Sequence, residues 1–294
     1  MRREVRIALV VLAQLACFWF FLLHAPSHEG GLMSDRLPQS PALRRHRCLP
    51  IAHRDRRFVR PGVCVTADER LRTLEDLVYA LKVLLENAQV AYWLDSGSLL
   101  GQYRAQELIP WDYNADFGVT MRGLEHLRAS ESDDVEVPEG YELAVFNSSR
   151  FKAGDCSKAV PARFVDTKLG FYANIFAFQE SKGLFKDIVR PAAAGAVEEE
   201  VGDGVVVETL LGPEPSELWH RCVHCPEVEE EGENPSRRPR NASQVKKHFQ
   251  IPKDWVFPLR PCKLEVFEVM CPAQSVPYLM YIFGNRFLTP ELWE

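Results

Sequence analysis

The chain has 294 residues, of which 46% are hydrophobic, and a formal net charge of −6 at pH 7. This length allows one large or two modest domains with a sizeable core, and the composition excludes a chain that is disordered throughout. The negative charge and the lack of a long Lys/Arg tract argue against a nucleic-acid partner, because such proteins neutralise phosphates with basic side chains.

The N-terminus predicts a single-pass membrane anchor. Residues 1–6 read MRREVR, and residues 7–23 form an uncharged apolar run at the short end of what spans a bilayer. The positive-inside rule places residues 1–6 in the cytosol and the rest in the lumen, which predicts a type II protein of the Golgi or ER membrane. A cleaved signal peptide is the alternative, but no A-x-A-like cleavage site follows the run. Pairing through the anchor leaves a homo- or hetero-oligomer open.

Residues 24–62 follow as a lumenal stem, rich in Pro, Arg and His and without apolar periodicity. A domain is predicted over residues 63–294. Within it, residues 196–206 and 227–247 are polar and predict surface loops.

The domain opens with a predicted helix. Thr66 and Glu69 fit a capping box, and leucines recur at helical spacing, so a helix is expected over residues 67–87 with its apolar stripe in the core. The β-branched and aromatic residues 90–94 predict a buried strand.

Further strands and one more helix complete an α/β pattern. A helix is expected to start near Gly97, followed by a strand over residues 115–120. Residues 163–168 and 170–178 are strand-like and are expected to form a hairpin in the same sheet. The fold class is therefore α/β, an α+β arrangement with a mixed sheet. The aromatic residues near the C-terminus, Tyr278 and Tyr281 among them, are expected to pack in the core as a last helix.

A candidate phosphate site lies at the start of the second helix. The small residues Ser96, Gly97 and Ser98 would let backbone N–H groups approach an anion, which the helix dipole also favours. Arg104, about two turns later, could donate to a phosphate.

Acidic residues follow in the segment WDYNADF. Asn114 and Asp116 alternate on the predicted strand and so share one face, close to Asp112. Such oxygens facing a small-residue helix start could hold Mg²⁺ against a nucleotide's phosphates. A β-turn rich in Asp and Asn would have a similar composition, and this alternative stays open.

These motifs resemble the LicD and fukutin family of phosphosugar and phosphocholine transferases. The resemblance rests on a small-residue motif, an arginine, an Ile-Pro-Trp-Asp segment and an acid, with a weaker likeness near the C-terminus: Asp95–Gly101, Arg104, Ile109–Asp112, Asp116, Pro258–Phe267, Cys271–Pro272, Phe283–Gly284 and Thr289–Pro290. It implies a nucleotidyltransferase-like fold, a CDP-linked donor, a glycan or glycoprotein acceptor, and Mg²⁺ or Mn²⁺.

The resemblance also assigns roles to individual residues. The metal ligands would be Asp112, Asn114, Asp116 and Asn174, and the candidate catalytic acids are Asp116, Asp112 and Asp166. At Asn114 and Asn174 the family has acids. An amide can bind a hard cation but adds no charge and cannot act as a base, so metal binding should be weakened. Two hypotheses follow, a transferase with an altered metal site and an impaired relative that binds a nucleotide, a glycan or a partner protein.

The lumenal cysteines and sequons add two further predictions. Cys222, Cys225, Cys262 and Cys271 are expected either to form disulfides, as an oxidising lumen favours, or to bind a structural Zn²⁺. Asn147 and Asn241 are predicted N-glycosylation sites.

Overall fold

The computed structural model describes most of the predicted domain. The residues that it describes are 48–51, 53–129, 135–148, 151, 160–184, 206–214, 219, 221–228 and 246–289. The predicted anchor at residues 7–23 lies outside them. Within the described ranges, no helix has both the length and the apolar character needed to cross a membrane.

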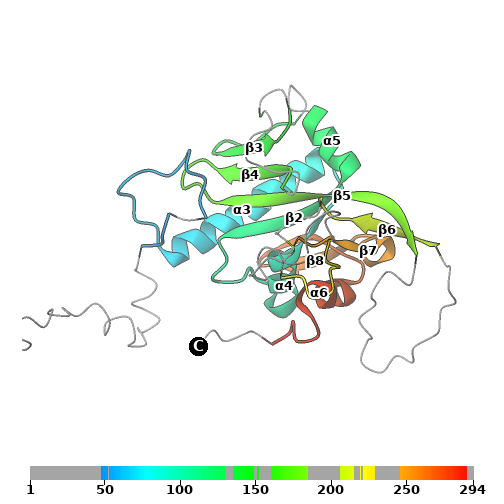
Figure 1. The fold of residues 1–294 in the computed structure, drawn as a ribbon. Coiled ribbons are helices and arrows are strands. Elements are labelled where there is room, and N and C mark those ends of the chain that lie inside the picture. Colours follow the sequence, from blue (N-terminus) through cyan, green and yellow to red (C-terminus); the bar gives the residue numbers. More distant parts are fainter. Residues whose placement is uncertain are drawn as a thin grey trace, which may run out of the picture. The chain divides into compact units, whose positions relative to one another are not determined.

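The first helix, α3 (Ala67–Asn87), has the predicted bounds. The Glu69 backbone N–H donates to Thr66 Oγ1 (3.2 Å), and the Thr66 N–H donates to Glu69 Oε2 (2.9 Å), which completes the capping box. Its leucine stripe, Leu74, Leu77, Leu81, Leu84 and Leu85, is buried as expected. The helix contacts β2, β4 and β5, so the stripe anchors it to the sheet (Figure 1).

The sheet is mixed, in agreement with the predicted fold class. Its main strand order is β1-β2-β5-β4-β3, and β6 and β7 extend it from β5. Among the strands in the described part of the chain, β2 and β5 pair in parallel, and the other pairs of this sheet are antiparallel. The strands are β1 (Tyr92–Leu94), β2 (Asn114–Thr120), β3 (Tyr141–Val145), β4 (Ala162–Asp166), β5 (Tyr172–Leu184), β6 (Val206–Leu211) and β7 (Gln250–Pro252).

The remaining elements gather beside β1 and β2 or at the ends of the sheet (Figure 1). α4 contacts β2, α6 and β8, and β9 contacts β1, which places the start of α4 directly beside β2. These elements are α4 (Ser96–Ala105), α5 (Met121–Ala129), the 3₁₀ helix η5 (Lys253–Trp255), the hairpin β8 (Arg260–Leu264) and β9 (Phe267–Cys271), and α6 (Ser275–Phe283).

Trp93 and Gly118 form a close contact in the core. A Cβ atom added to Gly118 would lie 2.2 Å from Trp93 Cε2, so only glycine lets the indole lie on the strand. The Trp93 ring contacts Phe178 and Phe257 at centroid distances of 5.2 and 5.8 Å. This aromatic layer covers the part of β2 that follows the acidic residues.

Residues 48–51 and 53–62, which the composition assigns to the stem, contact the predicted domain. Cys48 is disulfide-bonded to Cys64, the Asp55 N–H donates to Gly170 O (2.7 Å), and Arg54 Nη1 donates to Leu169 O (3.4 Å). The domain's contacts therefore begin before residue 63, in a segment that its composition assigned to the stem.

The predicted loops are only partly described. Val206, the last residue of the first loop, already belongs to β6. In the second loop, Glu227 and Lys247 pair as an isolated bridge, and Asn241 lies outside the described residues. Asn147 is exposed in a turn, which is a position that a glycan could occupy.

The cysteines pair as disulfides. Cys222 is bonded to Cys225, and Cys262 is bonded to Cys271. The zinc alternative for these four residues is wrong, because a disulfide sulfur has no thiolate to offer a metal.

Candidate active site

Asp116 on β2 is the centre of a compact polar cluster. One oxygen, Oδ1, accepts hydrogen bonds from Asn114 Nδ2 (2.8 Å) and Asn174 Nδ2 (3.0 Å). The backbone explains this arrangement, since Asn114 and Asp116 alternate on one strand and the parallel register of β2 and β5 places Asp116 opposite Asn174. All three side chains are partly exposed and can be reached from solvent.

The other oxygen of Asp116 faces Gly97 together with Asp112. A Cβ atom added to Gly97 would lie 2.8 Å from Asp112 Oδ2 and 4.0 Å from Asp116 Oδ2. Both carboxylates therefore converge on the start of α4, and the space between them exists because residue 97 has no side chain.

Asp95 is a third acid beside this pair. It is the N-cap of α4 and is fully buried. Its Oδ1 accepts from the Ser96 N–H (2.6 Å) and from the Tyr278 hydroxyl (2.8 Å), whereas Oδ2 is a buried oxygen without a hydrogen-bond partner among the described residues. Asp95 belongs to the small-residue motif Asp95–Gly101, but the sequence alone predicts no role for it. An acid directly after a buried strand and before a small-residue helix start was the available signal.

The pKa values of all three acids are raised. Burial, and then repulsion from Asp116, raises the pKa of Asp112 to about 7. Burial raises the pKa of Asp116 to about 6, although hydrogen bonds from Asn174 and Asn114 act against the shift. Burial also raises the pKa of Asp95 to about 7, with a further contribution from Asp116. The Arg70 guanidinium acts against the shift at Asp112, but ionising all three acids together is unfavourable without a further cation.

The polar groups at the start of α4 form hydrogen bonds with Asp95 and Asp116. The Ser96 N–H donates to Asp95, the Gly97 N–H helps to lower the pKa of Asp116, and Ser98 Oγ accepts from the Asp116 N–H (2.9 Å). Ser96 also has a left-handed backbone, with a φ of 45°. These groups orient Asp95 and Asp116 in the structure, and phosphate binding at Ser96, Gly97 and Ser98 stays a prediction.

Arg104 does not join the cluster. Its Nε donates to Phe287 O (2.7 Å), and its Nη2 donates to the carbonyls of Phe287 and Thr289. The predicted phosphate contact is not what the structure shows, because this side chain holds the segment that follows α6.

Asp166 is also placed elsewhere. Arg163 is opposite Asn174 in the β4–β5 pair, and residue 166 has the other parity along β4, so its side chain lies on the opposite face of the sheet. Its Oδ2 accepts from the Leu169 N–H (2.6 Å) in the turn after β4. The structure therefore gives Asp166 a role in the turn rather than in the cluster.

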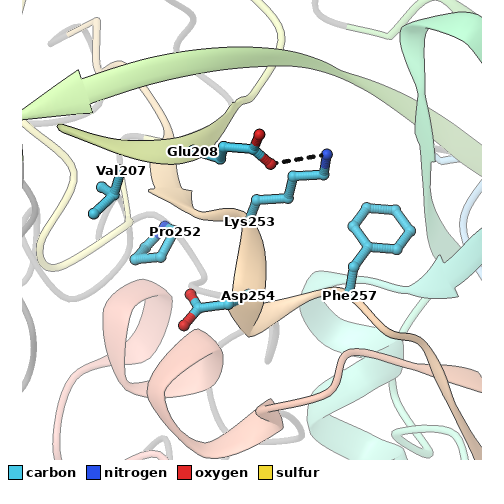
Figure 2. A pocket seen from close by; sticks show the side chains of 6 residues that line it. All are labelled: Val207, Glu208, Pro252, Lys253, Asp254 and Phe257. Atoms are coloured by element: carbon cyan, nitrogen blue, oxygen red, sulfur yellow. Dashed lines mark ion pairs between the residues drawn. The ribbon is translucent and has the colours of Figure 1, made fainter.

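Neither of two surface pockets in the described part of the chain overlaps the acids. One, of about 340 Å³, is lined by Val207, Glu208, Pro252, Lys253, Asp254 and Phe257 (Figure 2). Its lysine is already paired with Glu208 (3.2 Å) and Glu180 (3.3 Å). The other, of about 390 Å³, is lined by residues of α4 and the β8–β9 hairpin and by the start of α6. Because neither pocket contains Asp95, Asp112 or Asp116, the candidate active site is assigned from the clustered carboxylates and not from a cavity.

The cluster fits a divalent metal only through two carboxylates. No group of three His, Cys, Asp or Glu side chains within the described ranges is arranged to hold a metal ion. Asn114 and Asn174 turn their Nδ2 atoms toward Asp116, so they act as hydrogen-bond donors to it. Mg²⁺ is often bound by one or two carboxylates together with substrate phosphates. Asp112 and Asp116, with the space at Gly97, satisfy that smaller requirement.

Comparison with known proteins points to the same region. Residues 89–194 match the LicD/FKTN/FKRP nucleotidyltransferase domain model. The chain is 39% identical over 74 residues to the ribitol 5-phosphate transferase FKRP of Mus musculus and, equally, to that of Homo sapiens. Each alignment covers 24% of this chain and 15% of the relative. Residues 89–194 contain β1, α4, β2 and β5 and with them the whole acidic cluster, so the part of the chain that carries the cluster is similar to the LicD/FKTN/FKRP nucleotidyltransferase domain.

Proposed function

We propose that the protein is a transferase that moves a phosphorylated alditol from a CDP-linked donor to a hydroxyl group of a glycan acceptor. The observation that supports this most directly is the convergence of Asp112 and Asp116 on Gly97. The matched relatives are named as ribitol 5-phosphate transferases, which favours an alditol phosphate as the transferred group.

The cluster suits phosphoryl transfer because this chemistry depends mainly on positioning and charge neutralisation. Asp112 and Asp116 would hold Mg²⁺ or Mn²⁺, and this ion would neutralise charge on the donor's phosphates. Both acids are partly exposed, so either can approach a substrate, whereas Asp95 is fully buried. Asp95 holds the start of α4 through Ser96 and is itself held by Tyr278.

The proposed cellular setting follows from the N-terminal sequence. A type II anchor at residues 7–23 would place the domain in the lumen of the Golgi or ER, where glycan acceptors and disulfides occur. The three disulfides and the exposed sequon at Asn147 support a lumenal location.

The alternative is an impaired family member that binds a nucleotide, a glycan or a partner protein without transfer. The two amides around Asp116 favour it, since they supply hydrogen bonds where the resemblance expects two further negative charges. Fewer charges should weaken the binding of a divalent cation.

Release of CMP from CDP-ribitol by the purified full-length chain, with Mg²⁺ or Mn²⁺ and a glycan acceptor, separates the two proposals. A transferase releases CMP only with metal and acceptor present, and Asp116→Asn abolishes the release. Asp254→Asn changes an exposed acid of the pocket in Figure 2 and is the matched control. Donor binding without CMP release would favour the impaired relative, and the absence of both would reject the transferase and the nucleotide-binding form of the alternative.

A further inference from the structure

Arg163 lies one strand away from the acidic cluster. It is paired with Asn174 in the β4–β5 register, and its Nε donates to Asn174 Oδ1 (3.1 Å). The Nδ2 of the same amide donates to Asp116. A single side chain therefore separates a guanidinium from the central carboxylate, on the same face of the sheet.

The guanidinium is held in place but keeps free donors. Its Cζ lies 4.5 Å from the centroid of the Tyr172 ring, a cation–π contact that fixes the plane of the group. Arg163 is partly exposed, and among the described residues its hydrogen bond is made by Nε, to Asn174, and not by Nη1 or Nη2. The charge of Arg163 contributes to lowering the pKa of Asp55, but that carboxylate already forms an ion pair with Arg57.

The amide at position 174 leaves this positive charge available. A carboxylate in that place would form an ion pair with Arg163, whereas Asn174 accepts its hydrogen bond without neutralising it. A fixed arginine with two terminal nitrogens free is suited to bidentate binding of phosphate oxygens.

Other arginines near the cluster are committed to structural contacts. Arg104 donates to the carbonyls of Phe287 and Thr289. Arg70 is buried, donates to Pro110 O and lies over the Tyr113 ring. Of these three arginines, Arg163 alone combines exposure with uncommitted terminal nitrogens.

We propose that Arg163 binds the diphosphate of the nucleotide donor, the role that the sequence assigned to Arg104. The inference rests on the proposed function and adds the residue that recognises the donor's phosphates. The diphosphate would lie across Asn174, between the guanidinium and the carboxylate pair, so that cationic groups meet it from both sides once a divalent ion is bound.

Calorimetric titration of the purified full-length chain with CDP in the presence of Mn²⁺ tests this proposal. Arg163→Gln should lower CDP affinity by about 10-fold or more, the scale of a lost charge-assisted hydrogen bond. The CDP affinity of Arg163→Lys should lie between those of wild type and Arg163→Gln, because lysine keeps the charge without the planar fork of donors. Arg122→Gln, an exposed arginine on α5, should leave affinity unchanged.

A second titration, with Mn²⁺ alone, separates direct binding from positioning through Asn174. Direct phosphate binding predicts that Arg163→Gln leaves Mn²⁺ affinity within about twofold of wild type, a difference below about 0.4 kcal/mol. Equal losses of Mn²⁺ and CDP affinity would overturn the proposal, and so would wild-type CDP affinity in Arg163→Gln. A wild-type chain that binds no CDP would reject the proposed function itself.

Discussion

At the scale of single residues, the two amides determine what Asp116 can do. Both Nδ2 atoms donate to Oδ1, which leaves Oδ2 to face Asp112 and Gly97. One oxygen of Asp116 is therefore hydrogen-bonded to both amides, and the other lies on the side of Asp112 and Gly97, where the proposed cation would bind. The two amide hydrogen bonds offset part of the cost of burying the Asp116 carboxylate beside Asp112 and Asp95.

Asn114→Asp should make the protein depend on a divalent cation. The change removes a hydrogen bond to a charged acceptor, worth about 1.5–3 kcal/mol, and places a further carboxylate beside Asp116, Asp112 and Asp95. We expect a lower melting temperature in EDTA at pH 8, and a larger rise with Mn²⁺ than wild type shows. Asn285→Asp, at an exposed site, is the matched control. A variant that melts like wild type in both buffers would contradict this role for Asn114.

The pKa of Asp95 predicts a pH-dependent stability. Its folded value of about 7 lies above the value of about 3.9 expected in an unfolded chain, so the folded state holds more protons between these values. This group therefore lowers the free energy of unfolding as the pH rises from about 4 to about 7, and its effect is constant above that range.

Asp95→Asn should remove that contribution. In EDTA, the free energy of unfolding of the variant minus that of wild type should be higher at pH 8 than at pH 5, by about 1.4 kcal/mol for each pH unit between 5 and the folded pKa of about 7. Urea unfolding at both pH values measures the difference, with Asp254→Asn as the matched control for the loss of one carboxylate. If this free-energy difference were the same at both pH values, the charge of Asp95 would not destabilise the folded state.

At the scale of elements, the site depends on the register of β2 with β5 and on the start of α4. The alternation of Asn114 and Asp116 could be predicted from the sequence, because it needs only the period of a strand. The helix at residues 67–87 was equally predictable, since its cap and its leucine stripe are local signals. β2 carries Asn114 and Asp116, and α3 packs against this strand.

Long-range contacts account for what sequence reasoning missed. Arg104 reaches Phe287, 183 residues away, and no local pattern reports such a partner. Asp166 was misplaced because its face depends on how the β4–β5 hairpin is paired. The same pairing places Arg163 opposite Asn174. Knowledge of the β4–β5 register would therefore have predicted the positions of both Asp166 and Arg163. Residues 48–62 have the composition of a stem, and only their contacts with Leu169 and Gly170 show that they belong to the domain.

Gly97→Ala tests the start of α4. The new methyl group would lie 2.8 Å from Asp112 Oδ2 and would fill the space between the two carboxylates. Residue 97 lies inside the helix, where alanine is favoured over glycine by roughly 0.5–1 kcal/mol, so the fold should persist. We expect Mn²⁺ affinity to fall at least about 10-fold, measured by calorimetry.

Gly123→Ala is the control, because it should lower stability without changing Mn²⁺ affinity. Its methyl group would lie 2.9 Å from Val90 Cγ1 in the core, away from the acids. Overpacking of this kind typically costs about 1–3 kcal/mol, so the melting temperature should fall while Mn²⁺ affinity stays unchanged. If Gly97→Ala bound Mn²⁺ as wild type does, the metal would not lie between Asp112 and Asp116.

At the scale of the whole molecule, one mixed sheet joins the site to the core. β2 carries Asp116 at its start and Gly118 under Trp93 two residues later, so the acidic cluster borders an aromatic layer that includes Phe178 and Phe257. The disulfides close three short loops around this domain. The site therefore sits on strands and a helix start that are held rigidly from within.

Gly118→Ala should be among the most damaging small changes in the protein. Its methyl group would lie within 2.5 Å of three atoms of the Trp93 indole, which is itself fully buried. We expect a loss of about 3 kcal/mol or more of unfolding free energy, measured by urea unfolding. A loss below about 1 kcal/mol would show that the indole can move away from β2.

The central claim is that Asp112 and Asp116 bind a divalent cation together with the diphosphate of a CDP-linked donor. Thermal unfolding of the full-length chain with CDP-ribitol, in Mg²⁺ and in EDTA, tests it most directly. The account predicts that the donor raises the melting temperature in Mg²⁺, has little effect in EDTA, and has no effect on Asp116→Asn in either buffer. Equal stabilisation in Mg²⁺ and EDTA, or stabilisation retained by Asp116→Asn, would contradict it.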